Sequence, residues 1–226
     1  METTQSANMN KKIVDAAGLR AAREIAYAEF KKTQAVGKLT KQLSKLSDQL
    51  LSHLWNSCGL NNEATLVAVG GFGRGALFPY SDIDILILLP ADEEKARALS
   101  KQVEQFVASC WDTGLEIASS VRTVAECISE SEQDITVRTS LLEARFLCGK
   151  KQLFKEFAKA FEGAMDPKAF FQAKLAEQIQ RHYKYQNTPY SLEPNCKESP
   201  GGLRDLQVIS WVSKAALLGN TFKDLN

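Results

Sequence analysis

Residues 67–90 read VAVGGFGRGALFPYSDIDILILLP. The stretch joins a glycine-rich segment and an arginine to two aspartates one residue apart, and then continues into an almost wholly apolar run. Short apolar runs bounded by Gly or Pro are typical of buried strands, so we expect a strand, a glycine turn, a short link and a second strand opening with Asp82 and Asp84. Side chains at i and i+2 of a strand share a face. The two carboxylates are therefore predicted to point the same way, beside the glycine turn.

Two other phosphate-binding templates match the glycine stretch only in part. Gly71, Gly73 and Ala76 fit G-x-G-x-x-A. That fingerprint opens a crossover helix, however, and the next strand arrives before the ~10–12 residues that a βαβ crossover needs. Gly70 and Gly75 have the P-loop separation, but Ala76 stands where the P-loop lysine belongs. The arrangement of strand, glycine turn and D-x-D strand is what remains.

Paired carboxylates beside a glycine turn indicate a particular chemistry. Two ionised carboxylates at such a short distance repel each other unless a cation lies between them. Mg²⁺, with Mn²⁺ as an alternative, is a cation that suits oxygen ligands. In two-metal nucleotidyl transfer, ions ~3.5–4 Å apart hold the attacking and leaving oxygens. Glycine N–H groups, with no Cβ in the way, can approach a triphosphate. Arg74 could bind that triphosphate or cap the turn in a surface salt bridge. Either D-x-D or Gly-Gly alone is commonplace, but their combination favours a catalytic site.

A third acid is expected from a neighbouring strand. Residues 114–124, GLEIASSVRTV, have the pattern of a strand on which Glu116, Ala118 and Ser120 share a face. The two small residues would leave room for metal and nucleotide beside the carboxylate. The alternative is a glutamate on an edge strand that faces water.

Composition limits the possible partners. The 226 residues are 44% hydrophobic, enough for a sizeable core, and 28 Lys and Arg balance 27 Asp and Glu. With no overall positive field, a small phosphate ligand is expected rather than nucleic acid. Five cysteines without a C-x-x-C pair, and only two histidines, argue against a zinc site and for reduced thiols in the cytoplasm. The N-terminus lacks an apolar h-region and no window has ~18 consecutive apolar residues, so the chain is expected to be neither secreted nor membrane-spanning.

Hydrophobic spacing predicts an α/β (α+β) chain in which helices precede and follow a small sheet. Thr40 is a candidate N-cap for the second of two N-terminal helices, and Asp134 for a helix running to Gly149. The predicted helical segments are 13–57, broken at 35–40, then 92–111, 134–149, and most of 151–226 except a polar loop at 187–202. The predicted division is 1–60, an N-terminal helical segment; 61–150, the core; and 151–226, a helical lobe.

The positively charged residues of the predicted helical lobe each allow two interpretations. Residues 181–190, RHYKYQNTPY, could stack on nucleic-acid bases. The interpretation that we favour is that they are the end of an amphipathic helix that runs into a loop. Lys197 and Arg204, around PGGLRD, could face the triphosphate or cap a helix.

The sequence resembles a known family over nearly its whole length. GGFGRGALFPYSDIDILIL resembles the signature of the polymerase-beta-like nucleotidyltransferase superfamily. LEIASSVRTVAEC, DITVRTSLLEARFLCG and SLEPNCKESPGGLRDLQ resemble the N-terminal part of the bacterial PII uridylyltransferase/uridylyl-removing enzymes. The chain departs from that family at Ala118-Ser119-Ser120, where Gly-His-Ser is usual. The resemblance implies a polymerase-beta-like nucleotidyltransferase core with a small mixed sheet.

The same resemblance implies transfer of UMP from UTP to a tyrosine hydroxyl of the signalling protein PII. It gives Asp82 and Asp84 contact with two metal ions and Glu116 contact with the catalytic one. Gly70, Gly71 and Arg74 are expected to contact the triphosphate, and Ser81 to steady the turn beside them. Lys197 and Arg204 remain candidates for the triphosphate, with helix capping as their alternative role. In this family an HD phosphohydrolase domain and two glutamine-sensing ACT domains follow, so the chain is expected to be an N-terminal fragment. The alternatives are a nucleotidyltransferase with another NTP or acceptor, and a non-catalytic nucleotide-binding module.

Overall fold

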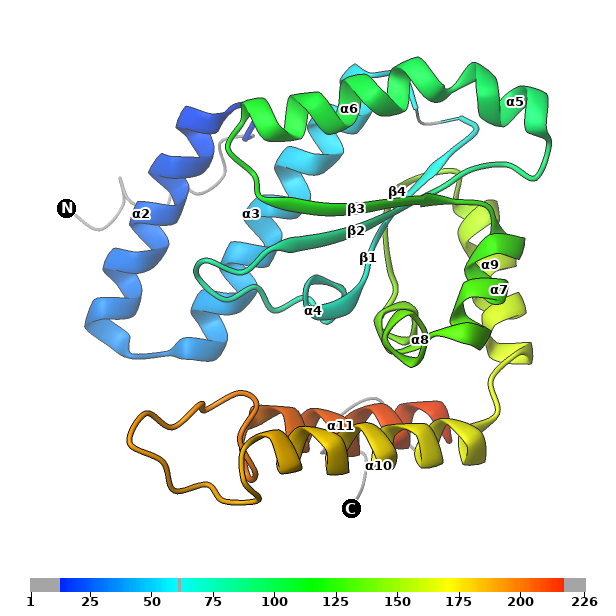
Figure 1. Cartoon of the computed structure of the whole chain (residues 1–226). Helices are drawn as coiled ribbons and strands as arrows, with labels where there is room; N and C mark the ends of the chain where they lie inside the picture. Colours follow the sequence, from blue (N-terminus) through cyan, green and yellow to red (C-terminus); the bar gives the residue numbers. More distant parts are fainter. Residues whose placement is uncertain (1–12, 61, 218–226) are drawn as a thin grey trace. The chain divides into compact units, whose positions relative to one another are not determined.

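The computed structural model describes residues 13–60 and 62–217 (Figure 1). The chain forms two compact units that interleave in sequence. The first unit runs to Cys127 and resumes over Glu143–Lys159, and the second takes Ile128–Leu142 and continues from Ala160. The division into 1–60, 61–150 and 151–226 stays a prediction.

Helices and a single small sheet make up the described part of the chain, as the sequence predicts. In chain order the elements are α2 (Ala16–Thr33), α3 (Val36–Ser57), β1 (Thr65–Ala68), α4 (Gly70–Gly73), β2 (Ile83–Leu88), α5 (Glu93–Ala98), α6 (Ser100–Asp112), β3 (Ile117–Arg122), α7 (Val124–Gln133), α8 (Ile135–Leu142), β4 (Arg145–Gly149), α9 (Lys151–Gly163), α10 (Pro167–Lys184) and α11 (Leu203–Ala215).

The sheet is mixed and has the strand order β3-β2-β1-β4. Strand β1 pairs antiparallel with both β2 and β4, with Ala68 opposite Ile85. Strands β2 and β3 are parallel, with Asp84 opposite Ala118. The predicted strands β1, β2 and β3 and the predicted mixed sheet are confirmed, and β3 is an edge strand.

Helices α3 and α6 pack on one face of this sheet (Figure 1). Trp55 of α3 meets Phe106 of α6 edge to face, with ring centroids 5.2 Å apart, and both side chains are fully buried. Ile83, Ile85 and Ile117 belong to the same core. Because side chains alternate along a strand, the residues between these isoleucines point to the opposite face. This alternation is what places Asp84 and Ala118 away from the α3–α6 core.

Thr40 is not a helix N-cap, contrary to the expectation from sequence. Helix α3 begins at Val36 after Ala35, which caps it without a side-chain hydrogen bond. Thr40 lies inside α3 and is buried, and its carbonyl accepts a hydrogen bond of 3.0 Å from Leu77 N. The threonine is thus a packing residue of α3 that contacts the segment after the glycine turn.

The single helix predicted for 134–149 is also wrong in its second half. Asp134 does cap a helix, because its carboxylate accepts a 2.6 Å hydrogen bond from Thr136 N. That helix, α8, ends at Leu142, and Arg145–Gly149 forms β4 against β1. Apolar residues there satisfy helical spacing as well as a strand pattern, so pairing with β1, far away in sequence, decides the outcome.

The second unit is built around α10 and α11, which lie side by side (Figure 1). Asp166 caps α10 by accepting hydrogen bonds from Lys168 N and Ala169 N, and Pro167 occupies the first helical position. Its core residues are Phe170, Val208, Trp211 and Ala215, with Ile135, Leu142, Met165 and Val212 packed against them. None of the helices in 13–60 and 62–217 has both the length and the apolar character needed to cross a membrane.

Candidate active site

The two predicted metal-binding aspartates lie at the start of strand β2. Asp82 is exposed and directly precedes the strand, whereas Asp84 is half-buried within it. Ile83 and Ile85 are buried between and beyond them. This burial pattern is that of a strand with one face on a core, so Asp82 and Asp84 project from the other face.

Glu116 stands next to the aspartates because of the parallel pairing of β2 and β3. Ile83 is in register with Ile117 and Asp84 with Ala118, and Ile83 N donates a 2.9 Å hydrogen bond to Glu116 O. Residues in register on paired strands share a face, so position 116 lies beside position 82 on the side of the carboxylates. Glu116 is exposed and precedes an edge strand. Its side chain is therefore open to the approach of a substrate.

The donor set suits a hard divalent cation. Within the ranges that the structure describes, no three Asp, Glu, His or Cys side chains are gathered closely enough to hold a metal ion by themselves. Mg²⁺ does not need such a cage, because it is usually held by one or two carboxylates together with substrate phosphates and water. Asp82 and Asp84 provide that pair of carboxylates, and Glu116 lies on the same face. The residues present therefore fit a magnesium ion brought together with a triphosphate.

The glycine-rich segment is one short helical turn, α4, that begins beside Asp84. Val69 N donates a 3.1 Å hydrogen bond to Asp84 O, which fixes the start of the turn against β2. Gly70 has φ 54°, a left-handed conformation that favours glycine. A Cβ on Gly71 would lie 3.6 Å from Nη2 of Arg74, so this guanidinium lies close to Gly71. Gly70, Gly71 and Arg74 thus form one local surface next to the aspartate strand.

The link between the turn and β2 holds Ser81 and an aromatic residue that sequence reasoning missed. Ser81 is exposed, and its N–H donates a 3.2 Å hydrogen bond to Phe78 O that closes the link. Tyr80 has φ 62° and a fully exposed side chain. A positive φ is uncommon for a bulky residue and cannot be recognised from the sequence.

Lys197 and Arg204 both belong to the second unit. Arg204 pairs with Glu198 at 3.0 Å, and its guanidinium carbon lies 5.4 Å from the centre of the Trp211 ring. Lys197 has an exposed side chain, and its N–H donates to Asn195 Oδ1. A contact of either cation with a triphosphate stays a prediction.

Asp205, in the same PGGLRD segment, organises the second unit. Its carboxylate accepts hydrogen bonds from Arg181 Nη2 at 2.6 Å and Gly201 N at 2.7 Å, and it also binds His182 and Gln178. Burial on its own would raise the pKa of Asp205, but these donors outweigh burial and hold the pKa well below its usual range. Arg181 and His182, the first residues of the RHYKYQNTPY segment, are therefore bound within the unit.

Protonation of Asp205 should destabilise the second unit at acid pH. Since the pKa of Asp205 is lower in the folded chain than in the unfolded one, its stabilisation is present above pH ~4 and is lost as the pH falls toward the folded pKa. Asp205→Asn should lower the melting temperature at pH 7. Between pH 5 and pH 3 the melting temperature of this variant should fall less than that of the wild type. Thermal unfolding followed by circular dichroism measures both effects. Glu193→Gln, in the exposed loop before α11, is the control; if both variants decline with acid as the wild type does, Asp205 has no such role.

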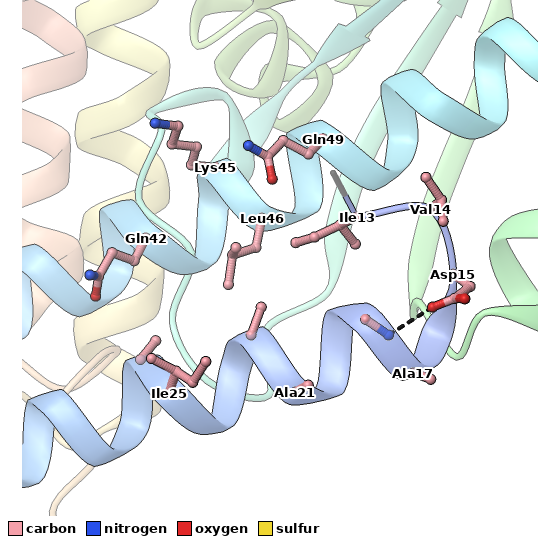
Figure 2. A pocket seen from close by; sticks show the side chains of 13 residues that line it. Ile13, Val14, Asp15, Ala17, Ala21, Ile25, Gln42, Lys45, Leu46 and Gln49 are labelled. Carbon is pink, nitrogen blue, oxygen red and sulfur yellow. Dashed lines mark hydrogen bonds between the residues drawn. The ribbon is translucent and has the colours of Figure 1, made fainter. Parts of the chain in front are cut away.

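A pocket of about 490 Å³ lies elsewhere, between α2 and α3 (Figure 2). Figure 2 shows Leu46 pointing from α3 toward α2, with Ile13 beside it. Small residues and Ile25 of α2, polar residues of α3, and Val14 and Asp15 also line it. None of the predicted site residues lines this pocket, so the candidate active site is the open carboxylate face of the sheet.

Comparison with known proteins agrees with the geometry. A family model described as "Nucleotidyltransferase domain" matches residues 51–141, which include the glycine turn, both aspartates and Glu116. A second, described as "GlnD PII-uridylyltransferase", matches residues 169–226.

Curated relatives match all or most of the chain. The bifunctional uridylyltransferase/uridylyl-removing enzymes of Cupriavidus metallidurans and Cupriavidus pinatubonensis are 52% and 51% identical over 225 residues, 100% of this chain and 26% and 25% of those proteins. The enzyme of the same name from Ralstonia nicotianae is 53% identical over 207 residues, 92% of this chain and 24% of that protein. The chain thus spans about a quarter of the length of these relatives. The chain is thus similar along its whole length to about a quarter of a bifunctional uridylyltransferase/uridylyl-removing enzyme, and it contains a nucleotidyltransferase core.

Proposed function

We propose that this chain transfers UMP from UTP to a tyrosine hydroxyl of a PII signalling protein, with Mg²⁺, and releases pyrophosphate. The relatives are named for two activities, uridylyl transfer and uridylyl removal, and we assign the first to these 226 residues. The five cysteines all lie within the described residues and none is in a disulfide, which supports a reducing compartment, and we propose the cytoplasm.

One observation carries this proposal. The glycine turn is tied to the strand of the aspartates through the hydrogen bond from Val69 N to Asp84 O. A phosphate held by the turn and a cation held by Asp82 and Asp84 would therefore meet on one face of the sheet. On that face Ala118 is exposed and Ser120 is half-buried, and these small side chains would leave room for a nucleotide.

The residues of this face have separate tasks in the reaction. Gly70, Gly71 and Arg74 bind and orient the triphosphate, with Arg74 compensating its negative charge. When bound, Mg²⁺ supplies charge stabilisation to the α-phosphate and the pyrophosphate leaving group. Glu116, on the same face as the aspartates, favours loss of the tyrosine proton to water as the phenolic oxygen attacks the α-phosphorus. The new bond joins the tyrosine oxygen to phosphorus, and the bond from the α-phosphorus to the pyrophosphate oxygen breaks in line.

A panel of labelled nucleotides tests the assignment. The chain is incubated with PII and each of UTP, ATP, CTP and GTP, with and without Mg²⁺, and PII is analysed by mass spectrometry. The proposal expects a mass gain of one UMP on a tyrosine, only with UTP and metal. Modification with another nucleotide would assign a different donor, and binding of UTP without any transfer would indicate a nucleotide-binding module.

Glu116→Gln should separate binding from chemistry. If Glu116 contacts only the catalytic ion, Asp82 and Asp84 still hold the ion that accompanies the triphosphate. We expect the Kd for UTP and Mg²⁺, measured by calorimetry, to change less than about threefold while turnover falls by about 100-fold or more. An equal loss of binding and turnover would assign Glu116 to the binding of the triphosphate instead. Glu104→Gln, an exposed carboxylate on α6, is the control.

A further inference from the structure

Arg145, the first residue of β4, contacts the side of the glycine turn that bears its carbonyl groups. Arg145 Nε donates to Gly73 O at 3.2 Å, and Nη2 donates to Phe72 O at 3.3 Å. Its guanidinium carbon also lies 5.3 Å from the centre of the buried Phe72 ring. The last two carbonyl groups of α4 are thus bound by one side chain.

Asp48 of α3 orients this guanidinium. Arg145 Nη1 and Nη2 donate to the two carboxylate oxygens of Asp48 at 2.8 and 3.0 Å. Such a two-bond pair fixes the plane of the guanidinium, and a lysine could not reproduce it. Both side chains are about 70% buried, since 31% of Arg145 and 28% of Asp48 is exposed. The pair is therefore more than a surface ion pair, and it links α3 to the turn.

The backbone around Arg145 leaves the turn little freedom. A Cβ on Gly73 would lie 2.0 Å from Glu143 O and 3.2 Å from Ala68 O. Gly73 is therefore in direct contact with the backbone two residues before Arg145. Movement of the turn away from Arg145 would break the Arg145 hydrogen bonds, and movement toward Glu143 would collide with its carbonyl group.

We propose that Arg145, oriented by Asp48, is a positioning residue that holds the glycine turn in the conformation needed to bind the triphosphate. The effect of Arg145 on triphosphate binding rests on the proposed function, whereas its contacts with the turn do not. Arg145 contacts carbonyl groups, so it leaves the N–H groups of Gly70 and Gly71 available to the nucleotide. A displacement of ~1 Å in a binding group can cost about 100-fold in rate, so an anchor of this kind is expected to matter.

Arg145→Lys, which keeps the charge and loses the paired hydrogen bonds, is the test. The first readout is amide hydrogen exchange of Gly73 and Gly75, whose N–H groups donate within the turn to Val69 O and Phe72 O. We expect their exchange to accelerate by about 10-fold or more while that of Leu66 in β1 is unchanged. The second readout is the KM for UTP, expected to rise by about 10-fold while the KM for PII is unchanged.

Lys150→Gln is the matched control, because Lys150 directly follows β4 and pairs with Glu63 at 3.5 Å without touching the turn. It should change neither readout. Asp48→Asn should give a smaller change in the same direction, and it provides a second measurement if Arg145→Lys folds poorly. Unchanged exchange of Gly73 and Gly75 in both variants would overturn the inference. A wild-type chain that transfers no UMP would refute the proposed function alone, since the exchange data still decide whether Arg145 anchors the turn.

Discussion

Asp82→Ala is expected to abolish UMP transfer while the chain keeps its fold. Asp82 is exposed and lies on the same side as Asp84, so its removal takes away a proposed metal ligand without opening the core. Loss of a group outside the ligand shell commonly costs 10–100-fold in metal affinity or activity, and loss of a ligand should exceed about 100-fold. Removal of one of two like charges also relieves repulsion in the absence of metal, so the melting temperature without Mg²⁺ should be unchanged or higher.

The measurement is turnover with PII, UTP and Mg²⁺, together with thermal unfolding in EDTA. Asp112→Asn, at the exposed end of α6, removes a negative charge from the same unit and should leave turnover within about twofold of the wild type. Asp84→Asn should repeat the loss of turnover. Normal transfer by either aspartate variant would refute the assignment of the metal site to these two carboxylates.

Local pattern is sufficient to predict the aspartate strand and its neighbours. A buried face of isoleucines alternates with Asp82 and Asp84, and that period of two can be read directly from SDIDILIL. The strand of Glu116 is recognised in the same way. Its position beside Asp82 depends on the parallel register of β2 and β3, which the structure supplies.

Contacts between distant parts of the chain could not be predicted. Strand β4 exists because Arg145–Gly149 pairs with β1, about 80 residues earlier, and its own residues are equally compatible with a helix. Arg145 and Asp48 are 97 residues apart, and neither lies in a pattern that indicates a partner. Gly149, at the end of β4, is the one local feature of the sequence that indicates the strand pairing. It has φ 99°, and a Cβ there would lie 2.4 Å from Ala64 O, so the close approach of the two backbones requires a glycine. A glycine after the apolar residues Phe146, Leu147 and Cys148 is also compatible with a helix C-terminus, so the sequence predicts a helix there.

Gly73→Ala should cause the largest loss of stability among single-methyl changes in the glycine turn. The added Cβ would lie 2.0 Å from Glu143 O and 2.9 Å from the carbonyl carbon of the same residue, and these are backbone atoms that cannot rotate away. Either α4 or the segment leading into β4 must move, which breaks the hydrogen bonds from Arg145 to the turn. We expect a cost at or above the upper end of the ~1–3 kcal/mol typical of overpacked cores. For a chain of this length that lowers the melting temperature by roughly 10 °C.

Gly37→Ala is the matched control, because Gly37 is exposed in the first turn of α3 and an added Cβ there meets no atom within 4 Å. Its melting temperature should be unchanged or higher, since alanine is favoured over glycine in a helix by up to about 1 kcal/mol. Gly71→Ala separates stability from binding: its Cβ would meet only the end of the flexible Arg74 side chain, at 3.6 Å. It should therefore fold normally and bind UTP more weakly. Equal melting temperatures for Gly73→Ala and Gly37→Ala would mean that the glycine turn and Glu143 are not in such close contact. The inference that Arg145 anchors the turn would then lose support.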